Sequence, residues 1–141
     1  MTDPRETPAN GRVAARHLRD RVEADRYVDG EAASVFVPVA DLNRAPGGPR
    51  DRQLLLGAAV TVYEQRDDWA FVQAVDGYVG YVASAALGPW TACTHCVAVR
   101  ATHAYAAPDI KAPDRMLLPL GARVAVTSAD GRFAETGLGF V

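Results

Sequence analysis

The stretch Trp69-Ala70-Phe71-Val72-Gln73-Ala74-Val75-Asp76-Gly77-Tyr78-Val79-Gly80-Tyr81-Val82 reads as two β-strands joined at Asp76-Gly77. Asp-Gly between two runs of apolar and aromatic residues is a strong signal for a hairpin with a two-residue turn. Similar runs lie at 34–39 and 54–64, and Arg66-Asp67-Asp68 is another tight polar turn. About five short strands in some fifty residues indicate a small antiparallel barrel. We also expect a single helical turn at 84–87.

The chain contains an internal repeat. Leu56-Gly57-Ala58-Ala59-Val60-Thr61-Val62 returns 64 positions later as Leu120-Gly121-Ala122-Arg123-Val124-Ala125-Val126, and Gly80-Tyr81-Val82 returns as Gly139-Phe140-Val141. Self-similarity at about sixty residues indicates two copies of one small barrel and not a solenoid, whose repeats are shorter. The second copy stops at Val141, within its closing strand, so we expect the chain to be part of a longer protein.

Residues 10–27 are predicted to form an α-helix, because Asn10-Gly11 can cap it and Asp29-Gly30 can end it. Apolar residues recur between these signals at helical spacing, namely Val13, Ala14, Leu18, Val22 and Tyr27. The expected fold is therefore mainly β, with one N-terminal α-helix and two small antiparallel barrels in tandem, the second truncated at its C-terminus. The expected divisions are an arm and helix at 1–30, a first barrel at 31–92 and an incomplete second barrel at 93–141.

Composition excludes several classes of function. The chain has 141 residues and a formal charge of −2, with 15 basic and 17 acidic residues, so it lacks the excess of Lys and Arg typical of nucleic-acid binding. No stretch approaches the ~18 apolar residues that cross a bilayer. The polar N-terminus is unlike a signal peptide. We therefore expect a cytoplasmic protein with no nucleic-acid or membrane partner, in which Cys93 and Cys96 are reduced thiols.

Cys93-Thr94-His95-Cys96, followed by His103, contains the atoms of a metal or redox site. A Cys-x-x-Cys pair strongly indicates zinc only when a second pair stands at the right distance, and here only histidines follow. A redox pair needs a strand-to-helix context that this linker does not offer. A cysteine nucleophile would need His17, His95 or His103 within hydrogen-bond reach. We expect structural thiols, no metal, no cofactor and no catalytic residue in this chain, with a small zinc protein as an alternative.

An aromatic and acidic set at the turns of the first barrel is the best candidate for recognition. It comprises Trp69, Phe71, Tyr78 and Tyr81, with Asp67, Asp68 and Asp76. Trp69 and Tyr81 return in the second copy as phenylalanines, which lack the polar atoms and indicate packing. Tyr78 has no counterpart there, so the barrel does not require it. A tyrosine beside a carboxylate suits an ammonium group, and we therefore select Tyr78 and Asp76 as substrate-binding residues.

Four stretches together resemble bacterial SH3 (SH3b) domains, in particular those that precede NlpC/P60 cysteine peptidases of the dipeptidyl-peptidase VI type. These are Thr7-Pro8-Ala9-Asn10-Gly11-Arg12-Val13-Ala14-Ala15; Val39-Ala40-Asp41-Leu42 to Gln53-Leu54-Leu55-Leu56-Gly57; the 69–82 stretch; and Thr94-His95 to Pro108-Asp109-Ile110-Lys111. The resemblance implies a helical arm, two SH3-like barrels and a papain-like catalytic domain whose Cys-His-His set would lie beyond Val141. Neither Cys93 nor Cys96 matches the family's nucleophile motif.

The resemblance also implies a substrate. Such enzymes cleave murein-derived peptides between γ-D-glutamate and the diamino acid, after a free L-Ala N-terminus. The first SH3b domain supplies aromatic and acidic groups that hold this amine, and the Asp-Gly-Tyr-x-Gly-aromatic hairpin points to Tyr78 with Asp76. Tyr81 stands where many relatives have Trp. The expected partners are this peptide and the NlpC/P60 catalytic domain of the same protein. A free-standing SH3b module that binds wall peptide or a partner protein is the alternative.

Overall fold

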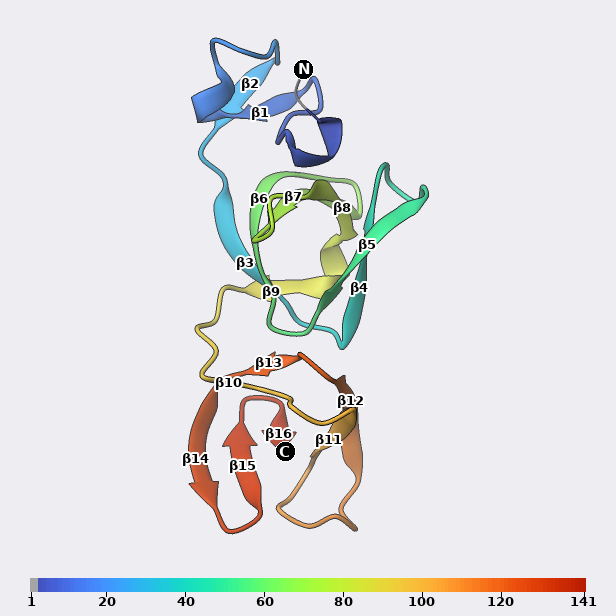
Figure 1. Cartoon of the computed structure of the whole chain (residues 1–141), viewed down its shortest axis with the longest axis vertical. Helices are drawn as coiled ribbons and strands as arrows, with labels where there is room; N and C mark the ends of the chain where they lie inside the picture. The colour runs from blue at the N-terminus through green and yellow to red at the C-terminus, as the bar shows by residue number, and fades with distance from the viewer. Residues whose placement is uncertain (1–2) are drawn as a thin grey trace.

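The structure, a computed structural model, describes residues 3–141, and three bodies follow one another along its long axis (Figure 1). An N-terminal segment lies at one end, a seven-stranded unit in the middle and a C-terminal unit at the other end. No described helix is long and apolar enough to cross a membrane. The expected divisions at 30/31 and 92/93 stay predictions.

The middle unit is an antiparallel sheet in the order β5-β4-β8-β7-β6-β3-β9. Its elements are β3 (Glu31–Val35), β4 (Val39–Asn43), β5 (Arg50–Leu55), β6 (Ala59–Arg66), β7 (Trp69–Ala74), β8 (Val79–Ala83), the 3₁₀ turn η3 (Ser84–Ala86) and β9 (Leu87–Pro89). The hairpin at Asp76-Gly77 is confirmed by the β7–β8 pairing, and the turn expected at 84–87 is confirmed as η3. Alternate residues of each strand fill the core, as Val60 and Val62 do on β6.

The C-terminal unit holds a five-stranded sheet in the order β12-β11-β16-β15-β14 and a separate pair, β10-β13. Its strands are β10 (His95–Cys96), β11 (Ala101–Tyr105), β12 (Asp114–Pro119), β13 (Arg123–Val124), β14 (Val126–Asp130), β15 (Phe133–Thr136) and β16 (Gly139–Phe140). After β16, Val141 exchanges two backbone hydrogen bonds of 2.9 Å with Ala134. Leu118 and Ala122 are fully buried in the core of this unit.

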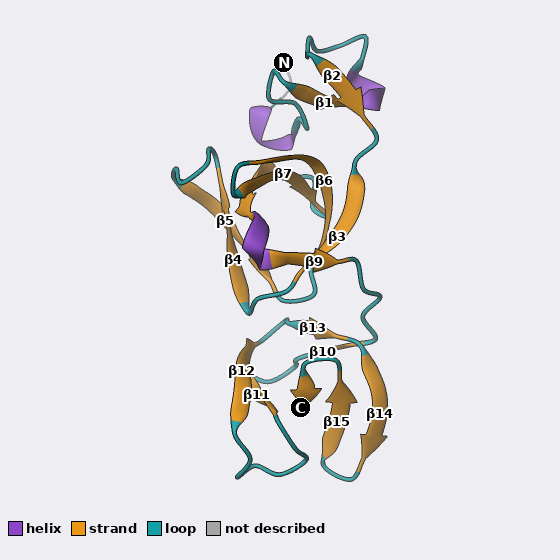
Figure 2. Cartoon of the chain, turned by 180° about the vertical axis from the view of Figure 1, so that it is seen from behind, coloured by secondary structure: helices purple, strands orange, loops and turns teal. Residues whose placement is uncertain are grey.

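The predicted N-terminal α-helix is wrong. Figure 2 shows only short helical turns, and among the described residues these are the 3₁₀ turns η1 (Pro4–Glu6), η2 (Arg16–Leu18) and η3. Residues 10–27 instead contain β1 (Val13–Ala15), η2 and β2 (Arg26–Val28), and β1 pairs with β2 in parallel.

Tertiary packing explains why this segment is not helical. The Asn10 side chain does accept hydrogen bonds from the N–H groups of Arg12 and Val13, as a helix cap would. Val13, however, packs against Phe71 in the middle unit, while its neighbours Ala14 and Ala15 are buried within the N-terminal segment. Burial of three consecutive residues toward two cores suits an extended chain, because a helix offers one apolar stripe.

The prediction of two small antiparallel barrels, the second incomplete, is also wrong, because both large sheets are open and no closed barrel forms. β5 and β9 end the middle sheet without pairing to each other, and β12 and β14 do the same in the C-terminal sheet. The hydrogen-bonded pairing of β4 with β8 is a single residue pair, Asn43↔Tyr81, and that of β11 with β16 is likewise one pair, Tyr105↔Phe140. The strands curl around their cores, but the short pairing leaves a seam in each sheet (Figure 1).

The turn after β5 joins the two units. Leu56 belongs to the chain of the middle unit, yet it is buried in the core of the C-terminal unit. Its carbonyl accepts a 2.8 Å hydrogen bond from the Arg123 N–H. Gly57 follows with φ +80°, and its α-carbon lies so close to Arg123 that a β-carbon would meet the Arg123 backbone oxygen. The two units are therefore packed at this turn and not only tethered.

We expect Gly57→Ala to lower the free energy of unfolding more than Gly47→Ala. Gly47 also has a positive φ, +67°, but open space around it, so its substitution costs only the backbone term of about 1–2 kcal/mol. An alanine at Gly57 adds a clash, with its β-carbon 2.7 Å from that of Arg123. Urea denaturation of both variants measures the difference. Equal losses would contradict the close contact at this turn.

Candidate functional site

A pocket of about 270 Å³ lies where the N-terminal segment meets the β6–β7 hairpin of the middle unit. We call it the Glu64 pocket. Its walls comprise Arg12, Pro46, Glu64, Arg66, Asp67, Trp69 and Tyr81. Six of these seven residues belong to the middle unit, and Arg12 comes from the residues just before β1. The pocket therefore combines two acidic side chains, two guanidinium groups and two aromatic rings.

Glu64 is the most buried charged group in this pocket, with a side chain only 7% exposed. The Arg12 guanidinium donates to both carboxylate oxygens, with its Nη2 2.8 Å from Oε1 and its Nε 3.1 Å from Oε2. The Asn10 amide donates a third hydrogen bond of 3.1 Å. These bonds, above all those from Arg12, hold the pKa of Glu64 below its ordinary value, and the carboxylate raises the pKa of Arg12. The carboxylate therefore stays charged although it is buried.

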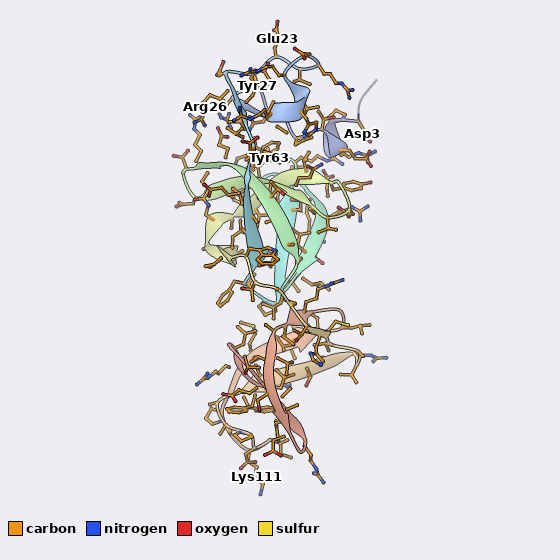
Figure 3. All side chains as sticks on the ribbon, turned by 90° about the vertical axis from the view of Figure 1, so that its left-hand side faces the viewer. Asp3, Glu23, Arg26, Tyr27, Tyr63 and Lys111 are labelled. Carbon is orange, nitrogen blue, oxygen red and sulfur yellow. The ribbon has the colours of Figure 1, made fainter. Side chains whose placement is uncertain are left out.

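Sequence reasoning missed Glu64, although a signal was present. β6 reads Val60-Thr61-Val62-Tyr63-Glu64, so Glu64 continues the inward series of Val60 and Val62. A carboxylate where alternation calls for an apolar residue indicates a buried polar partner. A bulge between Val62 and Glu64 shifts the register against β7. The adjacent Tyr63 packs against both the N-terminal segment and the middle unit (Figure 3).

Tyr81 and Trp69 form the aromatic part of the pocket. The Tyr81 ring packs 5.1 Å from that of Phe71, and its hydroxyl accepts a 3.0 Å hydrogen bond from the Asn10 amide. Trp69 begins β7 and is half-buried. Both residues were interpreted from the sequence as packing residues. In the structure Tyr81 packs against Phe71, and both Tyr81 and Trp69 line the pocket.

Asp67 and Arg66 supply exposed charges at the rim of the pocket. Asp67 is the only residue other than glycine with positive φ among residues 3–141, at +54°. Asp tolerates this conformation better than most residues, so the hairpin turn places its carboxylate outward. The Arg66 Nε lies 4.0 Å from this carboxylate, at the limit of an ion pair, and both side chains remain open to solvent.

The sequence-predicted residues Tyr78 and Asp76 lie together, but outside the Glu64 pocket. The Arg52 guanidinium carbon stands 3.7 Å above the centre of the Tyr78 ring, and Arg52 Nη1 lies 3.3 Å from an Asp76 oxygen. Asp76 also accepts a 3.1 Å hydrogen bond from the Tyr78 N–H. The cation expected at this pair is thus supplied by the protein's own Arg52. Binding of a ligand amine at Tyr78 stays a prediction, and it would require displacing Arg52.

Cys93 and Cys96 are free thiols. Cys93 Sγ lies 3.7 Å from the Thr91 carbonyl oxygen, and His95 pairs with the neighbouring Thr94 hydroxyl at 2.8 Å. His103 packs against Tyr105. Residues 3–141 hold no group of three His, Cys, Asp or Glu side chains placed to bind a metal ion.

Comparison with known families gives one match, within the middle unit. Residues 42–87 match the family described as the bacterial dipeptidyl-peptidase SH3 domain. The match runs from Leu42 in β4 to Leu87 in β9 and includes every residue of the Glu64 pocket except Arg12. It supports a bacterial SH3 domain in this part of the chain. No curated protein matches the chain.

We expect Arg12→Ala to lower the free energy of unfolding by about 1–3 kcal/mol, because it leaves the Glu64 carboxylate buried with one remaining donor. Arg16→Ala is the matched control. It removes an equally short pair, Arg16–Asp29, whose side chains are 59% and 74% exposed. Such an exposed pair contributes between about 0 and 1 kcal/mol. Chemical denaturation compares the two, and equal effects would contradict a structural role for the Arg12–Glu64 pair.

The same pair predicts a dependence of stability on pH. Because the folded pKa of Glu64 lies below its ordinary value of 4.5, its ion pair stabilises the protein above that pH. This contribution is lost as the pH falls through the folded pKa. Glu64→Gln removes it, so the stability difference between wild type and variant should be largest near neutral pH and shrink below about pH 4. Thermal melting from pH 7 to pH 3 measures it, and a constant difference would be the contrary result.

Proposed function

We propose that this chain is the non-catalytic, substrate-positioning part of a cytoplasmic NlpC/P60 hydrolase that acts on murein-derived peptides. In this proposal the Glu64 pocket holds the free amino end of the peptide, and a papain-like catalytic domain of the same protein cleaves it. The family match to a dipeptidyl-peptidase SH3 domain supports the class of enzyme. The charges of the pocket support the substrate.

The observation that carries the proposal is a pocket with charges of both signs beside two aromatic rings. A peptide that begins L-Ala-γ-D-Glu has an ammonium group at one end and a free α-carboxylate a few bonds away. Asp67 and the Trp69 ring suit the ammonium group, since carboxylates and aromatic faces both attract cations. Arg66, whose ion pair with Asp67 is long, suits the carboxylate. Glu64 and Arg12 neutralise each other and fix the pocket wall.

We further propose that the C-terminal unit is a second SH3b domain. The two units share a backbone arrangement at corresponding turns. The Gly57 N–H donates to the Val35 carbonyl and the Gly121 N–H to that of Val97, both at 2.9 Å. Gly57 and Gly121 have φ values of +80° and +89°. The alternative, a free-standing module that binds wall peptide or a partner protein, uses the same pocket and differs in needing no catalytic domain.

We expect L-Ala-γ-D-Glu-meso-diaminopimelate to bind this chain and its N-acetylated form to bind about tenfold more weakly, because acetylation removes the charged amine. Asp67→Asn should weaken binding of the free-amine peptide by a similar factor. Asp68→Asn, a change in the same turn but outside the pocket, is the matched control. Isothermal titration and shifts of the Trp69 indole signal provide the measurements.

Two results would contradict the proposed pocket. Equal affinity for the free and acetylated peptides would exclude recognition of the amine. Weaker binding by Asp76→Asn with no effect of Asp67→Asn would move the amine site to the Tyr78–Asp76 pair. Incubation of the chain alone with the peptide should release no diaminopimelate, and release would contradict a non-catalytic role.

A further inference from the structure

We propose that the free edge of β5 binds an extended peptide by strand addition. The binding surface is a cleft of about 570 Å³ between β5, the β7–β8 hairpin and residues 90–93, which we call the β5 cleft. Its lining includes Gln53, Leu54 and Leu55 of β5, Val75 and Asp76 of the hairpin turn, and Trp90. It shares no residue with the Glu64 pocket, so this proposal is independent of the proposed function.

One edge of β5 has unpaired backbone groups. β5 is the terminal strand of its sheet and pairs only with β4. The Leu56 N–H donates to the Pro38 carbonyl, which makes the pair Pro38–Leu56 a hydrogen-bonded one. Bonded and non-bonded pairs alternate in an antiparallel ladder, so Ala40↔Leu54 is bonded and Asp41↔Gln53 is not. The N–H and C=O groups of Gln53 therefore point away from β4.

Leu55 extends the same free edge by one donor. It lies opposite Val39 in a non-bonded pair, so its N–H also points away from β4. Its carbonyl already accepts a 3.0 Å hydrogen bond from the Ala58 N–H within the turn. An antiparallel peptide can therefore exchange two hydrogen bonds with Gln53 and accept a third from the Leu55 N–H. This pattern of one acceptor between two donors matches a polypeptide backbone.

Only one half of this edge is protected against the addition of another strand. Arg50, Asp51 and Arg52 begin β5, and charged side chains on an edge strand oppose the addition of another strand. No charged residue follows in Gln53-Leu54-Leu55, the half that borders the cleft. The protection therefore ends where the cleft begins.

An apolar surface lies beside this unprotected half of β5. Val75 is 85% exposed and Trp90 55% exposed, and both line the cleft. Side chains of an added strand point alternately to its two faces, so every second residue can rest on Trp90 or Val75. Asp76 and Arg123 place one charge of each sign among the lining residues. The occupant that fits is a peptide of alternating apolar and uncharged polar residues.

The test uses the capped pentapeptide acetyl-Val-Thr-Val-Thr-Val-amide as probe and hydrogen exchange followed by NMR as readout. In the free chain the amides of Gln53 and Leu55 should exchange much faster than that of Leu54. Saturating probe should slow the first two by about tenfold or more and leave Leu54 unchanged. The same peptide methylated at its backbone nitrogens should give no protection. Protection by the methylated peptide, or none by the probe at millimolar concentration, would overturn the proposal.

Two variants separate the backbone from the side chain. Gln53→Pro removes the outward N–H without breaking a bond to β4, so the fold should survive, and binding of the probe should fall about tenfold. Gln53→Ala keeps the N–H and should stay within about twofold of wild type. Trp90→Ala should weaken binding of the probe without altering the amide hydrogen exchange of the free chain. Equal affinity of Gln53→Pro and Gln53→Ala would refute strand addition.

A second copy of the chain is the competing occupant. Protection of the Gln53 and Leu55 amides that rises with protein concentration in the absence of probe would assign the edge to self-association and overturn the peptide proposal. Loss of peptide binding in Gln53→Pro with intact binding of the murein peptide would distinguish this site from the Glu64 pocket.

Discussion

The charged pair between Arg12 and Glu64 is the interaction that holds the N-terminal segment on the middle unit. A carboxylate inside a small β unit is costly unless it receives several hydrogen bonds. Here all three donors come from Asn10 and Arg12, so burial of one side chain in β6 specifies the position of a segment fifty residues earlier in the chain. Val13 then packs against Phe71 and completes the contact. Arg12 and Glu64 also line the Glu64 pocket, so the fold and the candidate site share a single constraint.

The parts of the fold that the sequence could predict are those in which local signals and tertiary packing agree. Asp76-Gly77 between two apolar runs required a hairpin, and the β7–β8 pairing is that hairpin. The repeat of Leu56-Gly57 at Leu120-Gly121 indicated equivalent turns, and both glycines adopt positive φ. The prediction of a helix at 10–27 was wrong because the apolar spacing suits a helix, whereas the buried residues are divided between two cores. The prediction of barrels was wrong because the number of strands does not determine whether the two end strands of a sheet pair with each other.

In the candidate site, too, local sequence signals predicted some features, whereas those that depend on tertiary packing were missed. Tyr78 and Asp76 lie together at the β7–β8 turn, as their spacing in the sequence predicted. The sequence could not show that Arg52 occupies the ring face, since that contact joins segments far apart in the chain. Glu64 could have been found, because it breaks an alternating apolar pattern. Its partners could not, because Asn10 and Arg12 were expected at the start of a helix and not beside β6. Trp69 and Tyr81 were interpreted as packing residues, and the structure gives each a second, pocket-facing surface.

The position of Leu56 has a consequence for how such chains can be divided and recombined. A unit of about sixty residues buries only about 60% of the surface that its unfolded chain exposes. The C-terminal unit completes its core with a side chain from the unit before it. Excision at the linker would leave a cavity in one piece and an exposed leucine on the other. Modularity in this chain therefore does not follow the boundaries of its sheets. The smallest portable piece is the pair of units, and any shuffling of the C-terminal unit must carry the turn at Leu56-Gly57 with it.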